Sequence, residues 1–183
     1  MPGIFYAGNH GLEMEDPHGL QSLAPGAYQG QPQLQSAIKQ LDAILPRVPG
    51  VWVEDKRWTA SIHYRLASEE HHALVGQIVK ATLEGVEELV LYHGRRVWEI
   101  RPAATWNKGT ALALFMKQCQ VSGSATAFLG DDVTDHDAFH VISDGWPGWI
   151  GENVPAAARM KLLDPADTAD LLLWMADVRL SAF

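Results

Sequence analysis

Two different periods of hydrophobic and polar positions organise the middle of the chain. In two segments the apolar residues recur every three or four positions, which is the spacing of a helix with one buried face. Each segment is followed by a pair of short stretches with the two-residue period of β-strands. We therefore expect helices at residues 33–45 and 68–83, and strands at residues 51–56, 59–65, 88–92 and 96–101. This order predicts an antiparallel sheet with helices on its apolar face and an open polar face.

Strand parity assigns the polar side chains of this sheet to the open face. Ile62 is expected to face the helices and His63 to face away; Ile100 and Glu99 are related in the same way. The open face should therefore carry Glu54, Lys56, Ser61, His63, Arg65, Glu99 and Arg101. Charges of both signs beside histidine suit a polyhydroxylated, anionic ligand. The alternative is an ordinary solvated surface, which is the usual state of a strand's outer face.

The rest of the chain has α/β character. A short strand at residues 2–7 should break at Gly8-Asn9-His10-Gly11, and a second strand at 12–15 should precede a loop rich in Gly, Pro and Gln at 17–32. Beyond the sheet, the pattern predicts a helix at 107–120, a strand at 125–129, a helix from Asp135, a short strand at 149–150 and a helix at 168–178.

Four carboxylates follow the apolar stretch 125–129, directly after Gly130. In an open α/β sheet, ligands bind outside the carboxyl ends of the strands, so this position directs the acids into a crevice. The adjacent Asp131 and Asp132 repel each other, and a cation would relieve that repulsion. Mg²⁺ is expected here, because it prefers oxygen ligands and often bridges one or two carboxylates to a phosphate.

A structural interpretation of the same acids remains open. Thr134 is a candidate cap for a helix beginning at Asp135, and Asp137 would complete a pattern that resembles a capping box. Asp135 and Asp137 would then favour the positive end of the helix dipole. This alternative does not account for Asp131 and Asp132, which precede such a cap.

Lys108 lies at the start of the predicted helix at 107–120. The helix dipole favours acids in the first turn, so a lysine there indicates another task, such as holding a phosphate near the carboxylates. The alternative is a solvated lysine at a frayed helix end.

Composition narrows the class of protein. The chain has 183 residues, 47% hydrophobic and 20% charged, which fits a globular protein with one ordinary domain or two small ones. Cys119 is the single cysteine, so no disulfide forms within the chain. The net charge of −8 argues against nucleic acid as the main partner. Neither a leader nor a membrane-length apolar run is apparent, so a cytoplasmic location and no membrane partner are expected.

Six segments occur in an order that resembles a known family. They are Gly8-Asn9-His10-Gly11, Val53-Glu54-Asp55-Lys56, His63-Tyr64-Arg65, Glu99-Ile100-Arg101-Pro102, Lys108-Gly109, and the run from Gly130 to Phe139. As an ordered set they resemble the trehalose-6-phosphate phosphatases of the haloacid-dehalogenase superfamily, over nearly the whole chain.

The resemblance implies an α/β fold with two parts. Residues 1–11 and 102–183 would form an incomplete Rossmann-like core, and residues 12–101 an inserted α+β cap that selects the sugar. The implied activity is the magnesium-dependent hydrolysis of trehalose 6-phosphate to trehalose and phosphate, a step of trehalose biosynthesis, with this sugar phosphate as the small-molecule partner.

The resemblance also implies roles for individual residues. Lys108 would hold the phosphate, Asp131 would bind the metal, and Asp132 and Asp135 would complete or orient the metal site. The sugar end would be bound by Asn9, His10, Glu54, Lys56, His63, Arg65, Glu99 and Arg101.

One departure separates this sequence from the family. The Asp-x-Asp-Gly-Thr motif that carries the family's nucleophile, and the Ser/Thr-Gly-Arg motif after it, do not occur in the sequence. We therefore expect a C-terminal portion of a phosphatase, with a missing N-terminal segment or chain, that is inactive alone. Two alternatives are a non-catalytic sugar-phosphate-binding protein and a phosphatase for another sugar phosphate.

Overall fold

The computed structural model describes residues 3–181 and separates into two compact units, Met1–Trp106 and Asn107–Phe183. Its α/β character agrees with the prediction. Residue 2 of the predicted first strand lies outside the described residues. The assignment of residues 1–11 to the core and of 12–101 to the cap stays a prediction. No helix within residues 3–181 is both long enough and apolar enough to span a lipid bilayer.

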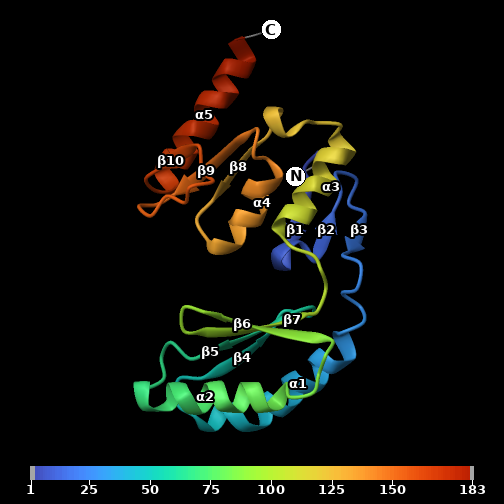
Figure 1. Cartoon of the computed structure of the whole chain (residues 1–183), viewed down its shortest axis with the longest axis vertical. Helices are drawn as coiled ribbons and strands as arrows, with labels where there is room; N and C mark the ends of the chain where they lie inside the picture. The colour runs from blue at the N-terminus through green and yellow to red at the C-terminus, as the bar shows by residue number, and fades with distance from the viewer. Residues whose placement is uncertain (1–2, 182–183) are drawn as a thin grey trace. The chain divides into compact units, whose positions relative to one another are not determined.

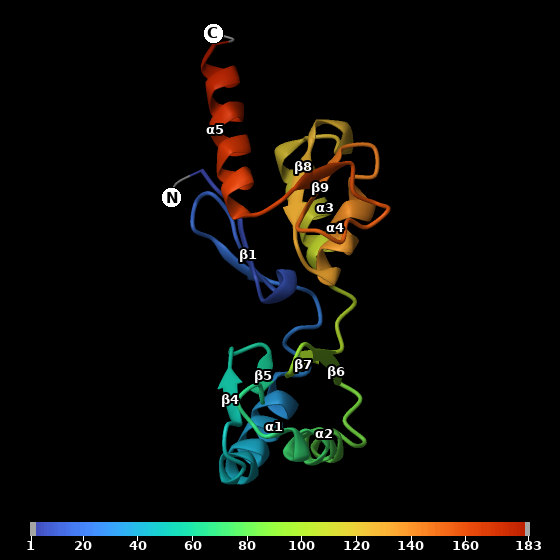
Figure 2. The ribbon, with the colours of Figure 1, turned by 90° about the vertical axis from the view of Figure 1, so that its left-hand side faces the viewer.

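The larger part of the first unit is the predicted helix–strand–strand repeat. Its helices are α1 (Gln31–Ile44), continued by the 3₁₀ turn η2 (Leu45–Arg47), and α2 (Glu69–Thr82). Its strands are β4 (Trp52–Asp55), β5 (Ala60–His63), β6 (Leu89–Gly94) and β7 (Val97–Pro102). The strands form an antiparallel sheet in the order β4-β5-β7-β6. Figures 1 and 2 show both helices on one face of this sheet, as the periodicity predicts.

The core of this layer lies between the helices and the sheet. Leu34 and Leu41 of α1 and Val75 of α2 are fully buried against Ile62 and Ile100 of the sheet. The spacing of these residues explains why the segments fold as they do: helix positions seven apart and alternate strand positions each align on one side.

A second sheet, of three short antiparallel strands, belongs to the same unit. It contains β1 (Tyr6–Gly8), β2 (Glu13–Glu15) and β3 (Gln21–Leu23), with the 3₁₀ turn η1 (Asn9–Gly11) between β1 and β2. The sequence predicted a loop at residues 17–32, and this prediction was wrong at residues 21–23, which form β3. This strand is only three residues long, and pairing with β2 defines it, so no period is visible in its sequence.

The second unit is a small parallel α/β layer. Its sheet has the order β10-β9-β8, built from β8 (Ala127–Gly130), β9 (Trp146–Ile150) and β10 (Met160–Leu162). Its helical elements are α3 (Lys108–Cys119), η3 (Gly123–Ala125), η4 (Val133–Asp135), α4 (His136–Val141) and α5 (Pro165–Ser181). Phe139 of α4 is 1% exposed and packs edge-on against Phe128 of β8.

Two details differ from the sequence predictions. The β6–β7 turn lies at Arg95-Arg96 instead of His93-Gly94, since Gly94 still pairs with Val97 and the left-handed residue is Arg96, with φ of 62°. The strand β10 was not predicted; it too has three residues and gains its strand character from parallel pairing with β9.

Candidate active site

Lys108 and the acidic loop meet in the second unit. Asn107 caps α3 through a capping box with Thr110, so Lys108 occupies a well-formed first turn and not a frayed end. Its ammonium lies 2.6 Å from Oδ1 of Asp135, while the Lys108 side chain stays 30% exposed. A partly accessible cation is thus held against a carboxylate that is only 3% exposed.

Asp135 also shapes the loop that follows β8. Its second oxygen, Oδ2, accepts the backbone N–H groups of Asp131, at 3.1 Å, and Asp132, at 2.9 Å. A Cβ at Gly130 would come within 2.4 Å of the Asp135 carboxyl carbon, so the glycine lets strand and carboxylate approach closely. One buried carboxylate therefore connects α3, the end of β8 and the acidic loop.

The capping alternative was wrong in its details. Asp132, not Thr134, caps η4: its Oδ1 accepts the N–H of Val133, and Asp135 completes the capping box. The Thr134 hydroxyl donates to Oδ2 of Asp132 at 2.9 Å. The helix α4 begins at His136, and no side-chain bond caps it. Asp132 therefore stabilises the loop.

Asp131 is the acid of this loop that remains available to a ligand. Its side chain is exposed, and within residues 3–181 nothing forms a hydrogen bond or ion pair with its carboxylate. Nor do any three His, Cys, Asp or Glu side chains in this range gather into a metal cluster. A single hard oxygen ligand fits Mg²⁺, which commonly binds through one or two carboxylates with water and substrate oxygens.

The polar face of the four-stranded sheet β4-β5-β7-β6, which we call the cap sheet after the predicted cap, carries a second group of predicted residues. The register aligns Glu54, Ser61, Glu99 and Tyr92 in one row across the four strands, and Trp52, His63 and Val97 in the next. The predicted alternation of the polar strand residues is confirmed by this register. Ser61 is only 1% exposed.

His63 and Lys56 both engage Glu54. The Nε2 atom of His63 lies 2.8 Å from Oε2 of Glu54, and the Lys56 ammonium lies 3.6 Å from the same oxygen. The His63 ring stacks on Trp52, with 4.7 Å between ring centroids and 14° between planes. The hydrogen bond from His63 lowers the pKa of Glu54 from its ordinary value.

Glu99 forms the second charged group, with Arg101 and His10. Arg101 donates to Oε2 of Glu99 from Nε, at 3.1 Å, and from Nη2. The Nε2 atom of His10 lies 2.9 Å from Nη2 of Arg101 and 3.5 Å from the Glu99 carboxylate. The hydrogen bond with His10, and then the Arg101 guanidinium, outweigh burial and lower the pKa of Glu99 to about 2.

Asn9 and His10 reach these groups through a strained turn. Asn9 and His10, the first two residues of η1, have left-handed backbones, with φ of 47° and 60°, a conformation that is costly outside glycine. The Asn9 amide donates to the carbonyl of Lys56, at 3.2 Å, and accepts from Thr59 Oγ1, at 3.0 Å. The surrounding hydrogen bonds hold this turn against the polar face of the sheet.

The structure does not bring every predicted site residue onto this face. Arg65 lies in an exposed turn after β5, beyond the last paired residue, so the strand parity does not extend to it. Lys108, Asp131, Asp132 and Asp135 belong to the second unit.

Sequence reasoning missed the aromatic members of the face. Trp52 and Tyr92 are 44% and 48% exposed, and the Arg101 guanidinium lies 4.4 Å from the centroid of the Tyr92 ring. Trp52 lies two positions before Glu54, so strand parity alone places it on the polar side and was a usable signal. Tyr92 is placed there by its pairing with Glu99.

Comparisons with known proteins agree in one family. A sequence profile described as trehalose-phosphatase matches residues 1–157. A trehalose-phosphate phosphatase of Mycobacterium tuberculosis is 40% identical over 147 residues, covering 78% of this chain and 37% of that protein. A trehalose 6-phosphate phosphatase of Zea mays is 33% identical over 194 residues, covering 95% of this chain and 54% of that protein.

A solved structure supports the fold class. The crystal structure of a trehalose-6-phosphate phosphatase related protein matches with a TM-score of 0.82 and 18% identity, covering 95% of this chain and 72% of that one. This likeness confirms the predicted α/β fold class. The chain spans 37% and 54% of the lengths of the two sequence relatives.

Proposed function

Because this chain belongs to the trehalose-phosphatase family, we propose that it forms the phosphate-binding and sugar-binding parts of a magnesium-dependent phosphatase acting on trehalose 6-phosphate. The observation that carries the proposal is the arrangement around Asp135, which holds a partly exposed lysine and turns the Asp131 carboxylate outward. We further propose a cytoplasmic enzyme of trehalose biosynthesis.

Lys108 would contact the phosphoryl oxygens of the substrate. Asp135 keeps the ammonium in place, and its Oδ2 keeps the preceding loop in register. Asp131 would hold Mg²⁺, and Asp132 would orient that site through its capping bonds. When bound, Mg²⁺ supplies positive charge that stabilises the phosphoryl group during transfer. In such reactions, positioning and electrostatics supply most of the catalysis.

The cap sheet would recognise the sugar. Glu54 and Glu99 offer carboxylate oxygens that accept hydrogen bonds from hydroxyl groups, and His63 and Arg101 hold those carboxylates in place. The remaining proposed contacts are Asn9, His10, Lys56 and Arg65.

Phosphate transfer in this family begins at an aspartate of the Asp-x-Asp-Gly-Thr motif, and a second aspartate acts as general acid and base. The 183-residue sequence contains no such string. We therefore expect this polypeptide alone to bind the sugar phosphate without hydrolysing it.

Calorimetric titration with trehalose 6-phosphate in the presence of Mg²⁺ tests the proposal. We expect binding that weakens about tenfold or more in Lys108→Ala and in Glu54→Gln, because each removes a charged hydrogen-bond partner. Glucose 6-phosphate should bind more weakly. Equal affinity for inorganic phosphate and trehalose 6-phosphate would contradict the sugar role, and phosphate release by the pure chain would contradict the expected inactivity.

A further inference from the structure

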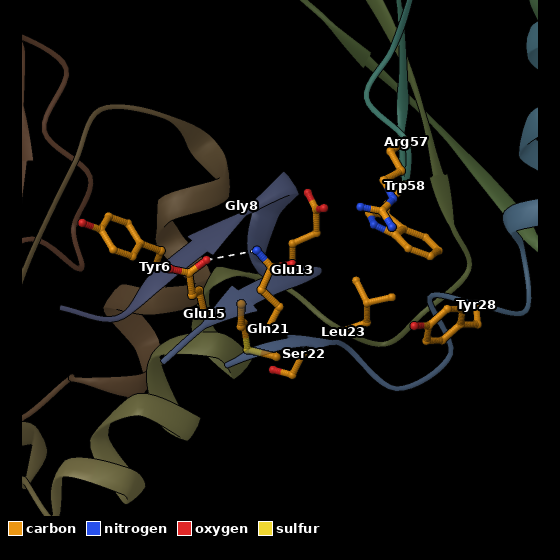
Figure 3. A pocket seen from close by; sticks show the side chains of 11 residues that line it. Tyr6, Gly8, Glu13, Glu15, Gln21, Ser22, Leu23, Tyr28, Arg57 and Trp58 are labelled. Carbon is orange, nitrogen blue, oxygen red and sulfur yellow. Dashed lines mark hydrogen bonds between the residues drawn. The ribbon is translucent and has the colours of Figure 1, made fainter. Parts of the chain in front are cut away.

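A groove of about 370 Å³ lies on the face of the β1–β2–β3 sheet, within the first unit (Figure 3). Its size is in the range of small-molecule sites. We propose that this groove binds a neutral, polyhydroxylated molecule of disaccharide size. The site is separate from the residues proposed above for the phosphate and the sugar, and it does not depend on the phosphatase activity.

The register of the small sheet places two carboxylates in this groove. Tyr6, Glu15 and Gln21 form one cross-strand row, and Gly8, Glu13 and Leu23 form the next row on the same face. Gln21 donates to Glu15 from Nε2 at 3.1 Å, which holds that carboxylate at the surface of the groove. Because Gly8 has no side chain, the sheet surface beside Glu13 stays open to a ligand.

Aromatic side chains line the opposite end of the groove. Trp58 is 6% exposed, and Tyr28, 69% exposed, packs edge-on against it with 5.1 Å between ring centroids. The Arg57 guanidinium lies 5.3 Å from the centroid of the Trp58 ring. Figure 3 shows Glu13 between this aromatic end and the end marked by Tyr6 and Glu15.

The chemistry of the lining selects the class of ligand. Two carboxylates face one guanidinium, so the groove is formally negative and disfavours a phosphate or another anion. The two carboxylates accept hydrogen bonds from hydroxyl groups. The Gln21 carboxamide can both donate a hydrogen bond to a hydroxyl group and accept one from it. The Tyr28 ring, supported by the buried Trp58, offers an apolar surface to the C–H face of a sugar ring.

The groove shares a wall with the proposed sugar-binding face. Oε2 of Glu13 accepts from the Asn9 amide at 2.5 Å, and that amide also bonds the Lys56 carbonyl. Arg57 and Trp58 belong to the same turn as Lys56, and Arg57 has a left-handed backbone with φ of 71°. A ligand that contacts Glu13 or this turn therefore touches the groups that position Asn9 and Lys56.

Amide and indole NMR spectra of the full chain, titrated with trehalose, test the groove directly. We expect shifts at the Trp58 indole, assigned with Trp58→Phe, and at the Gln21 carboxamide. Tyr28→Ala and Glu15→Gln should each weaken this binding about fivefold, as expected for a lost ring contact or a lost charged hydrogen bond. Tyr28 is mostly exposed, so its replacement should leave the fold intact, which circular dichroism verifies.

The matched control is Tyr92→Ala, which removes an exposed tyrosine from the cap sheet instead. Unchanged trehalose shifts at Trp58 in this variant support the groove. Loss of binding in Tyr92→Ala but not in Tyr28→Ala would place the sugar on the cap sheet, which overturns the groove while leaving the proposed phosphatase function standing. Shifts caused only by inorganic phosphate or by spermidine would overturn the class of ligand.

Discussion

The Lys108 ammonium and the Asp135 carboxylate, 2.6 Å apart, join the first turn of α3 to the loop that follows β8. The carboxylate is only 3% exposed, and its other oxygen accepts two backbone N–H groups, so it is not accessible to substrate. Asp135 is thus a positioning residue, whereas Lys108 and Asp131 keep exposed surface. Asp131 and Asp135 look alike in the sequence, and their different burial in the structure distinguishes their roles.

Replacing Asp135 should destabilise the second unit. Asp135→Ala leaves the Lys108 ammonium and two loop N–H groups without their acceptor, and we expect a loss of about 2 kcal/mol or more in the free energy of unfolding. Asp135→Asn should lose less free energy of unfolding, because its carboxamide oxygen can still accept either the Lys108 bond or the two loop N–H bonds. Urea unfolding followed by circular dichroism measures both changes.

Asp137→Asn is the control for Asp135, because Asp137 lies two residues further on, in the first turn of α4, and is exposed. Its effect should stay within about 0.5 kcal/mol, as for other surface substitutions. A comparable loss in both variants would show that the charge of the loop, and not the contacts of Asp135, determines stability.

The sequence predicted the elements whose side chains carry a period. The helices α1 and α2 and the strands β4, β5 and β7 follow from their apolar spacing, and the same parity placed Glu54, His63 and Glu99 on one face. The strands β3 and β10 were missed, because three residues are too few to show alternation and pairing alone defines them.

The sequence could not rank the acids of the loop. Asp131, Asp132 and Asp135 have the same chemistry, and only the fold determines which carboxylate meets Lys108, which caps η4 and which faces outward. The left-handed backbones at Asn9 and His10 were equally invisible, because neither residue type requires that conformation. The groove beside Glu13 depends on the register of strands that local patterns do not specify.

Gly109→Ala should be strongly destabilising, although alanine favours helices. A Cβ at Gly109 would lie 2.5 Å from the Asp137 carbonyl oxygen, so α3 and α4 would have to separate. We expect a loss of about 1–3 kcal/mol, the range for overpacked cores. Thermal unfolding of the variant provides the measurement.

Gly76→Ala is the matched comparison in α2. There the three atoms nearest to a Cβ all belong to the Trp98 side chain, the first at 3.3 Å, and we expect the ring to shift by a few tenths of an ångström. The gain of about 1 kcal/mol in helix propensity offsets that contact. If Gly76→Ala lost as much stability as Gly109→Ala, the distinction between backbone and side-chain obstruction would be wrong.

Stability should depend on Glu99 at acidic pH. Its pKa is lowered from 4.5 to about 2, so its contribution is fully present above pH 4.5 and disappears as the pH falls to about 2. The contribution is about 3 kcal/mol at most. The free-energy difference between wild type and Glu99→Gln should therefore be largest above pH 4.5 and shrink toward pH 2, as measured by urea unfolding across this range. A constant difference would contradict the lowered pKa.

Trp52 should act on the proposed sugar-binding face through His63. The stacked indole holds the imidazole plane, and the imidazole bonds Glu54 at 2.8 Å, which lowers the pKa of that carboxyl. In Trp52→Ala the ring loses its support, so we expect the pKa of Glu54 to rise toward its ordinary value. NMR titration of the Glu54 carboxyl carbon measures the shift.

Trp52→Phe distinguishes positioning from simple packing. Phenylalanine keeps a flat ring beside His63 and should keep the pKa of Glu54 low, whereas alanine should not. Because Trp52 is 44% exposed, neither variant should change the free energy of unfolding by much more than about 1 kcal/mol. A pKa of Glu54 that is unchanged in Trp52→Ala would mean that Lys56 and the backbone orient His63 and Glu54 without the indole.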